Sequence, residues 1–145
     1  MLLALLVVVA LVVVTAVIGV VWRARTGAVR RVDGGSTDLV ALGLDAPPGE
    51  RVSLVQLSTT MCAACRPTAR LLQDVARTVP GAVHVEILLD EHPHIADRFA
   101  VLQTPTTLLL DAGGVVRARL AGAPRRADLE AAVADIVKES NVRAH

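Results

Sequence analysis

The hydrophobic residues of this chain are concentrated in one block near its N-terminus. Residues Leu2 to Val21 are Leu, Val, Ile and Ala, interrupted only by Thr15 and Gly19. At a rise of 1.5 Å per residue, about 20 such residues cover roughly 30 Å, the thickness of a bilayer's hydrocarbon core. Since no ionisable side chain opposes insertion, the block predicts a transmembrane anchor over residues 1–22, with Trp22 at the headgroup level.

A cleaved signal peptide is the main alternative for this block. Such a peptide has a basic segment, an apolar core of about 7–15 residues and a small-x-small cleavage site. Here no basic residue precedes the block, the block is longer, and only Thr26-Gly27-Ala28 approaches a cleavage pattern. We therefore favour the anchor. A buried helix is disfavoured because the remaining chain is too short to enclose it.

The basic residues beside the block bear on its orientation. Only the α-amino group precedes the block. Four arginines follow it, namely Arg23, Arg25, Arg30 and Arg31. The positive-inside rule therefore favours a single-pass protein of the cell membrane with a cytoplasmic C-terminal domain, and the exoplasmic side stays open. The domain from Arg51 onward has a nearly balanced charge. This balance argues against a nucleic-acid partner.

Residues 23–50 are predicted to be a juxtamembrane linker. They contain two clusters of turn-forming residues, Asp33-Gly34-Gly35-Ser36 and Ala46-Pro47-Pro48-Gly49. The intervening segment from Asp38 to Leu44 could form a short helical turn or a strand.

Short apolar runs and one-faced helical patterns alternate over residues 51–140, which we predict to be one domain, followed by a tail at 141–145. Strands are expected at Val52–Leu57, Val83–Leu89, Thr106–Leu110 and Val115–Leu120, and helices at Cys65–Val79, Ile95–Ala100 and Leu129–Val137. A strand-helix-strand crossover gives parallel pairing, and a four-residue turn gives an antiparallel hairpin. The order β-α-β-α-β-β-α therefore predicts an α/β fold, with one mixed sheet covered by helices.

Cys62 and Cys65 are the two cysteines of the chain, and they lie between the first predicted strand and helix of the domain. The unpaired N–H groups and dipole of a helix N-terminus stabilise a thiolate, which is the attacking form of the thiol. Cys65, one turn later, could resolve a mixed disulfide. The alternatives are two inert core thiols or a structural disulfide, although closing so small a loop removes little chain entropy. The position favours a redox-active dithiol.

Metal binding is a further alternative for the two thiols. His92-Pro93-His94 could supply ligands, but its spacing differs from the H-x3–5-H pairing of zinc sites. Copper carriers commonly have methionine two residues before the first cysteine, where this chain has Thr60. We assign no metal ligand and no cofactor.

A Thr104-Pro105-Thr106 segment precedes the third predicted strand of the domain. A proline entering a strand gives up one donor of the ladder, and an X-Pro bond can be cis at modest cost. By itself the segment could be an ordinary strand entry.

Together these features resemble the thioredoxin family over roughly residues 51–137. The resemblance rests on Ser58-Thr59-Thr60-Met61, Cys62-Ala63-Ala64-Cys65-Arg66-Pro67, Leu89 to Pro93, Phe99 to Thr106, Asp111 to Gly114, and Gly122. It implies a thioredoxin-like fold, with Cys62 as the nucleophile and Cys65 as the resolving thiol. It also implies that Pro105 is a cis-proline beside the dithiol and that the Thr104 backbone binds the substrate chain. The partners would be protein disulfides or thiols and an upstream electron donor, with no cofactor.

The chain departs from this family at several positions. Thioredoxin has Trp before its first active-site cysteine and Gly-Pro between the cysteines, where this chain has Met61 and Ala63-Ala64. The family's buried acid falls on Gln56, and its lysine on the next strand falls on Glu86. The usual route for deprotonating the second cysteine is therefore missing. Glu86 could replace it, or could be a solvated strand carboxylate.

The sequence as a whole predicts a membrane-tethered thiol–disulfide oxidoreductase. Two alternatives remain. One is an exported envelope disulfide reductase resembling the TlpA/ResA group, which serves cytochrome maturation. The other is a tethered metal-binding carrier without enzymatic activity.

Overall fold

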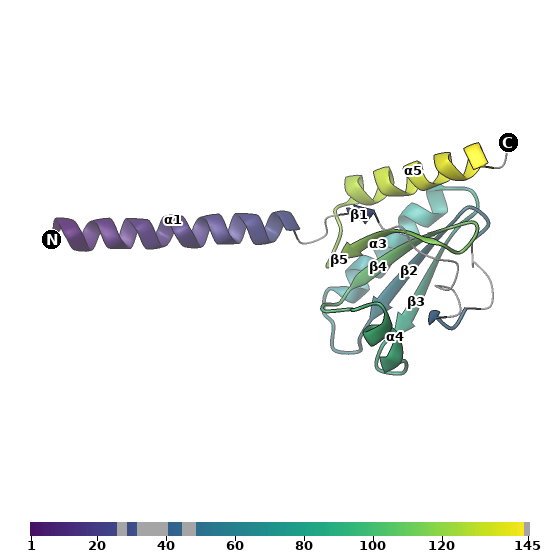
Figure 1. Ribbon diagram of the computed structural model, residues 1–145, viewed down its shortest axis with the longest axis horizontal. Coiled ribbons are helices and arrows are strands. Elements are labelled where there is room, and N and C mark those ends of the chain that lie inside the picture. The colour runs from purple at the N-terminus through teal and green to yellow at the C-terminus, as the bar shows by residue number, and fades with distance from the viewer. Residues whose placement is uncertain (26–28, 32–40, 45–48, 144–145) are drawn as a thin grey trace.

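The structure, a computed structural model, describes residues 1–25, 29–31, 41–44 and 49–143. Figure 1 shows a long N-terminal helix followed by an α/β domain. The elements in chain order are α1 (Leu2–Arg25), β1 (Val29–Arg31), β2 (Val52–Ser58), α3 (Cys65–Thr78), β3 (Ala82–Leu88), α4 (Pro93–Arg98), β4 (Thr106–Asp111), β5 (Val116–Ala121) and α5 (Arg126–Arg143). The predicted order of strands and helices over residues 51–140 is confirmed.

The apolar block forms one uninterrupted helix, α1. Its Leu2–Val21 segment has a mean hydropathy of 3.2, and none of it is buried within the described structure. By length and composition this helix could cross a membrane, although a signal sequence near the N-terminus would meet the same criterion. The Trp22 side chain and the Thr26-Gly27-Ala28 segment lie outside the described residues.

Five strands form one mixed sheet in the order β1-β5-β4-β2-β3. The β2 and β3 strands are parallel because α3 connects them, and the other neighbouring pairs are antiparallel. One row of the sheet runs from Val29 through Leu120 and Thr107 to Gln56. The strands of the sheet thus end on two sides, and the N-terminal end of β1 lies on the same side as the C-terminal end of β2.

Parts of the predicted linker, residues 23–50, belong to the folded domain. Strand β1 lies within it, and Leu42 is buried in the core with 2% of its surface exposed. Arg31 of β1 forms ion pairs of 2.8 Å with both Asp135 and Glu139 of α5. The cluster Asp33 to Ser36 and residues 38–40 and 45–48 lie outside the described residues. The exact domain boundaries stay a prediction, although α5 extends into the predicted tail at 141–145.

Two hydrophobic clusters cover the two faces of the sheet. On one face, α3 and α5 pack against alternate residues of the strands, in a cluster that includes Val52, Leu54, Leu72, Leu109 and Leu129. On the other face, α4 and Leu42 pack against the intervening residues, which include Val55, Leu57, Leu108 and Leu110. The period-2 alternation of β2 therefore divides its side chains between two covered faces, which explains why every residue of the strand is buried.

The turn between β4 and β5 is organised by the carboxylate of Asp111. Its Oδ1 accepts hydrogen bonds from the N–H groups of Gly113 (2.9 Å) and Val115 (3.0 Å), and its Oδ2 accepts one from Arg117 Nε (2.7 Å). Burial disfavours the charged form, but the hydrogen bonds and the guanidinium outweigh it, so the pKa of Asp111 lies below its usual value.

The lowered pKa of Asp111 predicts a pH-dependent contribution to stability. The contribution should be complete above the unfolded pKa, about 3.9, and should be lost as the pH falls towards the folded pKa. Replacing Asp111 with Asn should therefore lower the free energy of unfolding at pH 7 and weaken its dependence on pH below about 4. Denaturant unfolding of the full chain in detergent, followed by circular dichroism, would measure this. Asp97→Asn, at an exposed position of α4, is the control; an equal effect there would contradict the prediction.

Candidate active site

The two cysteines lie in the turn that joins β2 to α3. The Cys62 N–H donates to Thr59 O (3.2 Å) and the Cys65 N–H donates to Cys62 O (3.2 Å), so the loop closes directly onto the helix. Helix α3 begins at Cys65, and its N-cap residue, Ala64, makes no side-chain capping bond. Cys62 and Cys65 form a disulfide with their Cα atoms 5.4 Å apart. The structure thus shows the dithiol in its oxidised form.

The two sulfur-bearing residues differ in their access to solvent. Cys62 is half-buried, whereas Cys65 has only 4% of its surface exposed. A disulfide of another protein can therefore approach Cys62 but is shielded from Cys65. This asymmetry matches the division of labour between an attacking thiol and a resolving thiol.

The loop before β4 lies at the same end of the strands as the dithiol. The peptide bond between Thr104 and Pro105 is cis, and Pro105 is buried. Because Thr106 pairs with Leu57, this loop enters the sheet beside the C-terminal end of β2. The hydroxyl of Thr104 lies 3.3 Å from that of Thr59, which joins the loop to the strand end that precedes the cysteines.

Two hydrophobic side chains are exposed on these loops. Met61, next to Cys62, and Leu102, in the segment before Pro105, each expose 94% of their surface. Single exposed apolar side chains are common on protein surfaces, but these two lie on the loops that carry the dithiol and the cis-proline. These side chains are suited to contact an approaching protein chain.

Other side chains that hold this site together were not predicted from the sequence. Asp90 Oδ2 accepts a hydrogen bond of 2.6 Å from the Thr60 N–H, and Arg119 donates to the carbonyls of Phe99 and Ala100. Ala100 adopts a φ of 45°, which is unfavourable for a residue with a Cβ atom. The position of Asp90 just after β3 is the one signal that could have indicated its role, because the C-terminal ends of parallel strands share one edge.

A polar cluster lies beneath the start of α3, and it resolves how Glu86 is oriented. Gln56 is fully buried, and its Nε2 donates to Cys65 O (3.0 Å), Ser58 Oγ (2.8 Å) and Glu86 Oε1 (3.3 Å). The hydroxyl of Ser58 donates to the same Glu86 oxygen over 2.6 Å. Glu86 therefore turns its Oε1 towards the polar cluster behind Cys65, although the residue as a whole is exposed to solvent.

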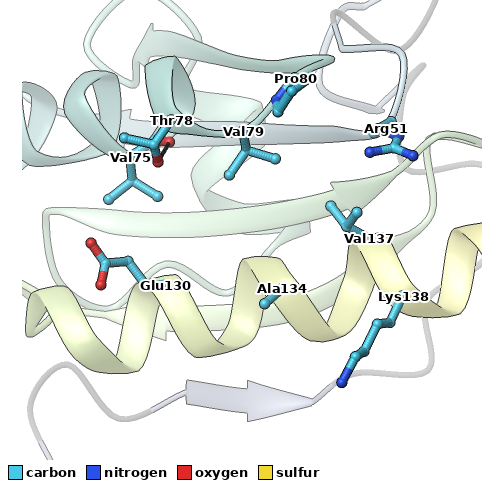
Figure 2. Close-up of a pocket in the computed structure, with 9 residues that line it drawn as sticks. All are labelled: Arg51, Val75, Thr78, Val79, Pro80, Glu130, Ala134, Val137 and Lys138. Carbon is cyan, nitrogen blue, oxygen red and sulfur yellow. Dashed lines mark hydrogen bonds between the residues drawn. The ribbon is translucent and has the colours of Figure 1, made fainter.

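A groove of about 380 Å³ lies at the other end of α3 from the dithiol. Figure 2 shows Val75 and Val79 of the α3 end facing Ala134 and Val137 of α5 across it. The cysteines lie at the N-terminal end of α3, so this groove is separate from the disulfide. His92 and His94 are both exposed, at the start of α4, with ring centroids 6.0 Å apart.

Comparisons with known proteins agree with this geometry. The thioredoxin family model matches residues 47–135. A thioredoxin from Alicyclobacillus acidocaldarius is 31% identical over 91 residues, which cover 62% of this chain and 86% of that protein.

Solved thioredoxins share the fold. A mutant thioredoxin from Halobacterium salinarum has a TM-score of 0.55 and 21% identity, covering 72% of this chain and 87% of its own. Mitochondrial thioredoxin 3 from Saccharomyces cerevisiae, in its oxidised form, has a TM-score of 0.52 and 24% identity, covering 59% and 79%. With a family match over more than half of its length and a dithiol at the expected place, the chain belongs to the thioredoxin family and is a thiol–disulfide oxidoreductase.

Proposed function

We propose that this protein is a membrane-tethered thiol–disulfide oxidoreductase in which Cys62 is the nucleophile and Cys65 the resolving thiol. The observation that carries the proposal is the asymmetric disulfide, with Cys62 half-buried in the loop and Cys65 buried at the start of α3. The positive end of this helix's dipole favours a thiolate in the loop before it.

The reaction in the reducing direction has two steps. The Cys62 thiolate attacks one sulfur of a substrate disulfide, forming a mixed disulfide and releasing the other substrate sulfur as a thiolate. The Cys65 thiol then loses its proton and attacks the Cys62 sulfur. The Cys62–Cys65 bond forms, the bond to the substrate breaks, and the substrate leaves fully reduced. An upstream dithiol donor regenerates the protein by the reverse exchange.

Thr104 and Pro105 are proposed to bind the substrate chain. Their loop lies beside the dithiol, and the hydrogen-bonding contact between Thr104 and Thr59 fixes its distance from the cysteine loop. An extended substrate segment pairing with the Thr104 backbone would run past Cys62. The exposed side chains of Met61 and Leu102 would add apolar contact on either side.

The tether is proposed to be α1, and the sheet supports a location of the dithiol close to the membrane. Arg25, the last residue of α1, and Val29 are four Cα steps apart, which span at most about 15 Å. Val29 begins β1 at the end of the strands where the dithiol lies. Three strand spacings, about 14 Å, separate β1 from β2. Substrates and electron donors held at the membrane surface would therefore be within reach.

Labelling in intact cells tests both the tether and its orientation. Because the chain has only two cysteines, an impermeant maleimide reports directly on this dithiol. We expect a full-length protein in the membrane fraction that is labelled only after the cells are opened, because the arginines after α1 favour a cytoplasmic domain. Labelling of intact cells, after treatment with an impermeant reductant, would instead indicate the exported alternative. A shortened protein in the soluble fraction would indicate a cleaved signal peptide.

A further inference from the structure

We propose that Glu86 accepts the proton of Cys65 through the hydroxyl of Ser58, which Gln56 positions, when Cys65 attacks the mixed disulfide. The proposal rests on the proposed function and deepens it. A thiol with 4% exposure is shielded from the water that would otherwise take its proton. The strand beneath it, β2, contains no ionisable residue. Glu86, on the neighbouring strand, is the carboxylate that hydrogen bonds from Gln56 connect to the Cys65 backbone.

The register of the sheet explains how Glu86 reaches this position. Gln56 of β2 pairs directly with Glu86 of β3, so their side chains emerge on the same face of the sheet. That face carries α3, which begins with Cys65. Ser58, two residues after Gln56, lies on the same face and places its hydroxyl 2.6 Å from Glu86 Oε1.

The hydrogen bonds give each residue of this cluster a distinct task. An amide cannot accept a proton at neutral pH, so Gln56 positions the others through its bonds to Cys65 O, Ser58 and Glu86. The Ser58 hydroxyl can pass a proton, because it both donates and accepts. Glu86 is exposed to solvent, so it can return the proton to water after each turnover.

The space behind Cys65 is lined by buried polar side chains, although apolar side chains would fill a core equally well. Three buried oxygens on residues around it have no hydrogen-bond partner within the described part of the chain: Gln56 Oε1, Thr68 Oγ1 and Thr107 Oγ1. Thr107 pairs with Gln56 across the sheet, and Thr68 follows Cys65 by three residues on α3. A buried polar group without a partner destabilises a core. A role in proton movement accounts for keeping them.

Resolution by Cys65 moves one proton and exchanges one disulfide bond for another. The proton of Cys65 Sγ moves to Ser58 Oγ as the hydroxyl proton of Ser58 moves to Glu86 Oε1. The electron pair left on Cys65 forms the bond to Cys62 Sγ. The bond between Cys62 and the substrate sulfur breaks, and the substrate leaves as a thiolate that solvent protonates. The disulfide and the protonated Glu86 are the products on the protein.

Other charged groups near Glu86 are few. On β3, His84 lies on the same face two residues earlier; burial lowers its pKa, and the charge of Glu86 partly opposes this shift. The charged residues of α3, the helix packed against β3, are all exposed: Arg66, Arg70, Asp74 and Arg77. The pH profile of the resolving step should therefore be compared in Glu86 and His84 variants.

The test separates the two steps of the reaction with an aromatic disulfide. Reduced full-length protein in detergent is mixed with 5,5′-dithiobis(2-nitrobenzoate), and the release of thionitrobenzoate is followed by stopped flow. The first phase reports attack by Cys62 and the second reports resolution by Cys65. At pH 7, Glu86→Gln should slow the second phase on the order of 10²-fold and leave the first phase within twofold, whereas Glu86→Asp should recover most of the rate.

The pH dependence distinguishes proton transfer from a structural role. In Glu86→Gln, the second phase should rise about tenfold per pH unit until it meets the wild-type rate near the thiol pKa, about 8.5. A rate that stays low at every pH, or both phases slowed alike, would overturn the proposal. An unchanged second phase at pH 7 would do so too.

Two controls complete the design. Glu50→Gln, an exposed carboxylate before β2 at the opposite end of that strand, should change neither phase. His84→Gln should keep the wild-type profile; if it reproduces the Glu86→Gln profile, His84 and not Glu86 is the acceptor. Wild-type protein that releases no thionitrobenzoate would contradict the proposed function itself, independently of Glu86.

Discussion

Replacing Cys62 with Ser should abolish disulfide reduction by the full chain, with a loss of at least about 10³-fold in the rate of insulin reduction. The hydroxyl is nearly the same size as the thiol but is not ionised at neutral pH, so no mixed disulfide can form. Insulin turbidity with dithiothreitol as the electron donor measures the rate in detergent. Retained activity in Cys62→Ser would rule out Cys62 as the nucleophile.

The matched variant Cys65→Ser should behave differently. Cys62 would still attack, but without the resolving thiol the mixed disulfide with the substrate should accumulate. Non-reducing electrophoresis and intact mass would detect this covalent adduct, which should be missing in Cys62→Ser. If Cys62→Ser trapped the adduct instead, the roles of the two cysteines would be reversed, in spite of the burial of Cys65.

Truncating Leu54 to Ala should lower the free energy of unfolding by about 2–5 kcal/mol. Leu54 is completely buried on β2, which lies between β3 and β4, and it belongs to the cluster with Leu72 and Val75 of α3. The loss combines the transfer free energy of the removed carbons with the cavity they leave, and it is a large part of the 5–15 kcal/mol typical of a domain.

The same truncation at Leu102 provides the control. Leu102 exposes 94% of its surface, so Leu102→Ala should change the free energy of unfolding by less than about 0.5 kcal/mol. Circular dichroism during guanidinium unfolding is a suitable signal. Tryptophan fluorescence is not, because Trp22, the chain's one tryptophan, lies at the end of α1 rather than in the domain. Equal losses in both variants would contradict the assignment of the core.

The sequence predicted most of the fold because its signals are local. The block from Leu2 to Val21 needs only hydrophobicity to indicate a helix of membrane length. The apolar runs of β2 and β4 and the helical spacing of α3 each fit one period, and their observed ends differ from the predicted ones by a residue or so. The position of Cys62 and Cys65 between a strand and a helix indicated redox chemistry without any knowledge of the tertiary structure.

Strand β1 could not be predicted in this way. Val29-Arg30-Arg31 has neither an apolar run nor an alternation, and it forms a strand because β5 offers it an edge. The carboxylates that pair with Arg31 lie 104 and 108 residues further along the chain, on α5. A local sequence pattern cannot indicate contacts between residues so far apart in the chain.

The sequence alone thus determined the elements of this protein other than β1 and the identity of its dithiol, since both depend on residue type and spacing within a few turns of chain. Only the tertiary structure decided that Cys62 is half-buried and Cys65 buried, because burial depends on which elements pack together. It also decided that Glu86 faces Ser58 and Gln56. The side-chain period of a strand leaves two faces open, and only the register of β3 against β2 selects between them.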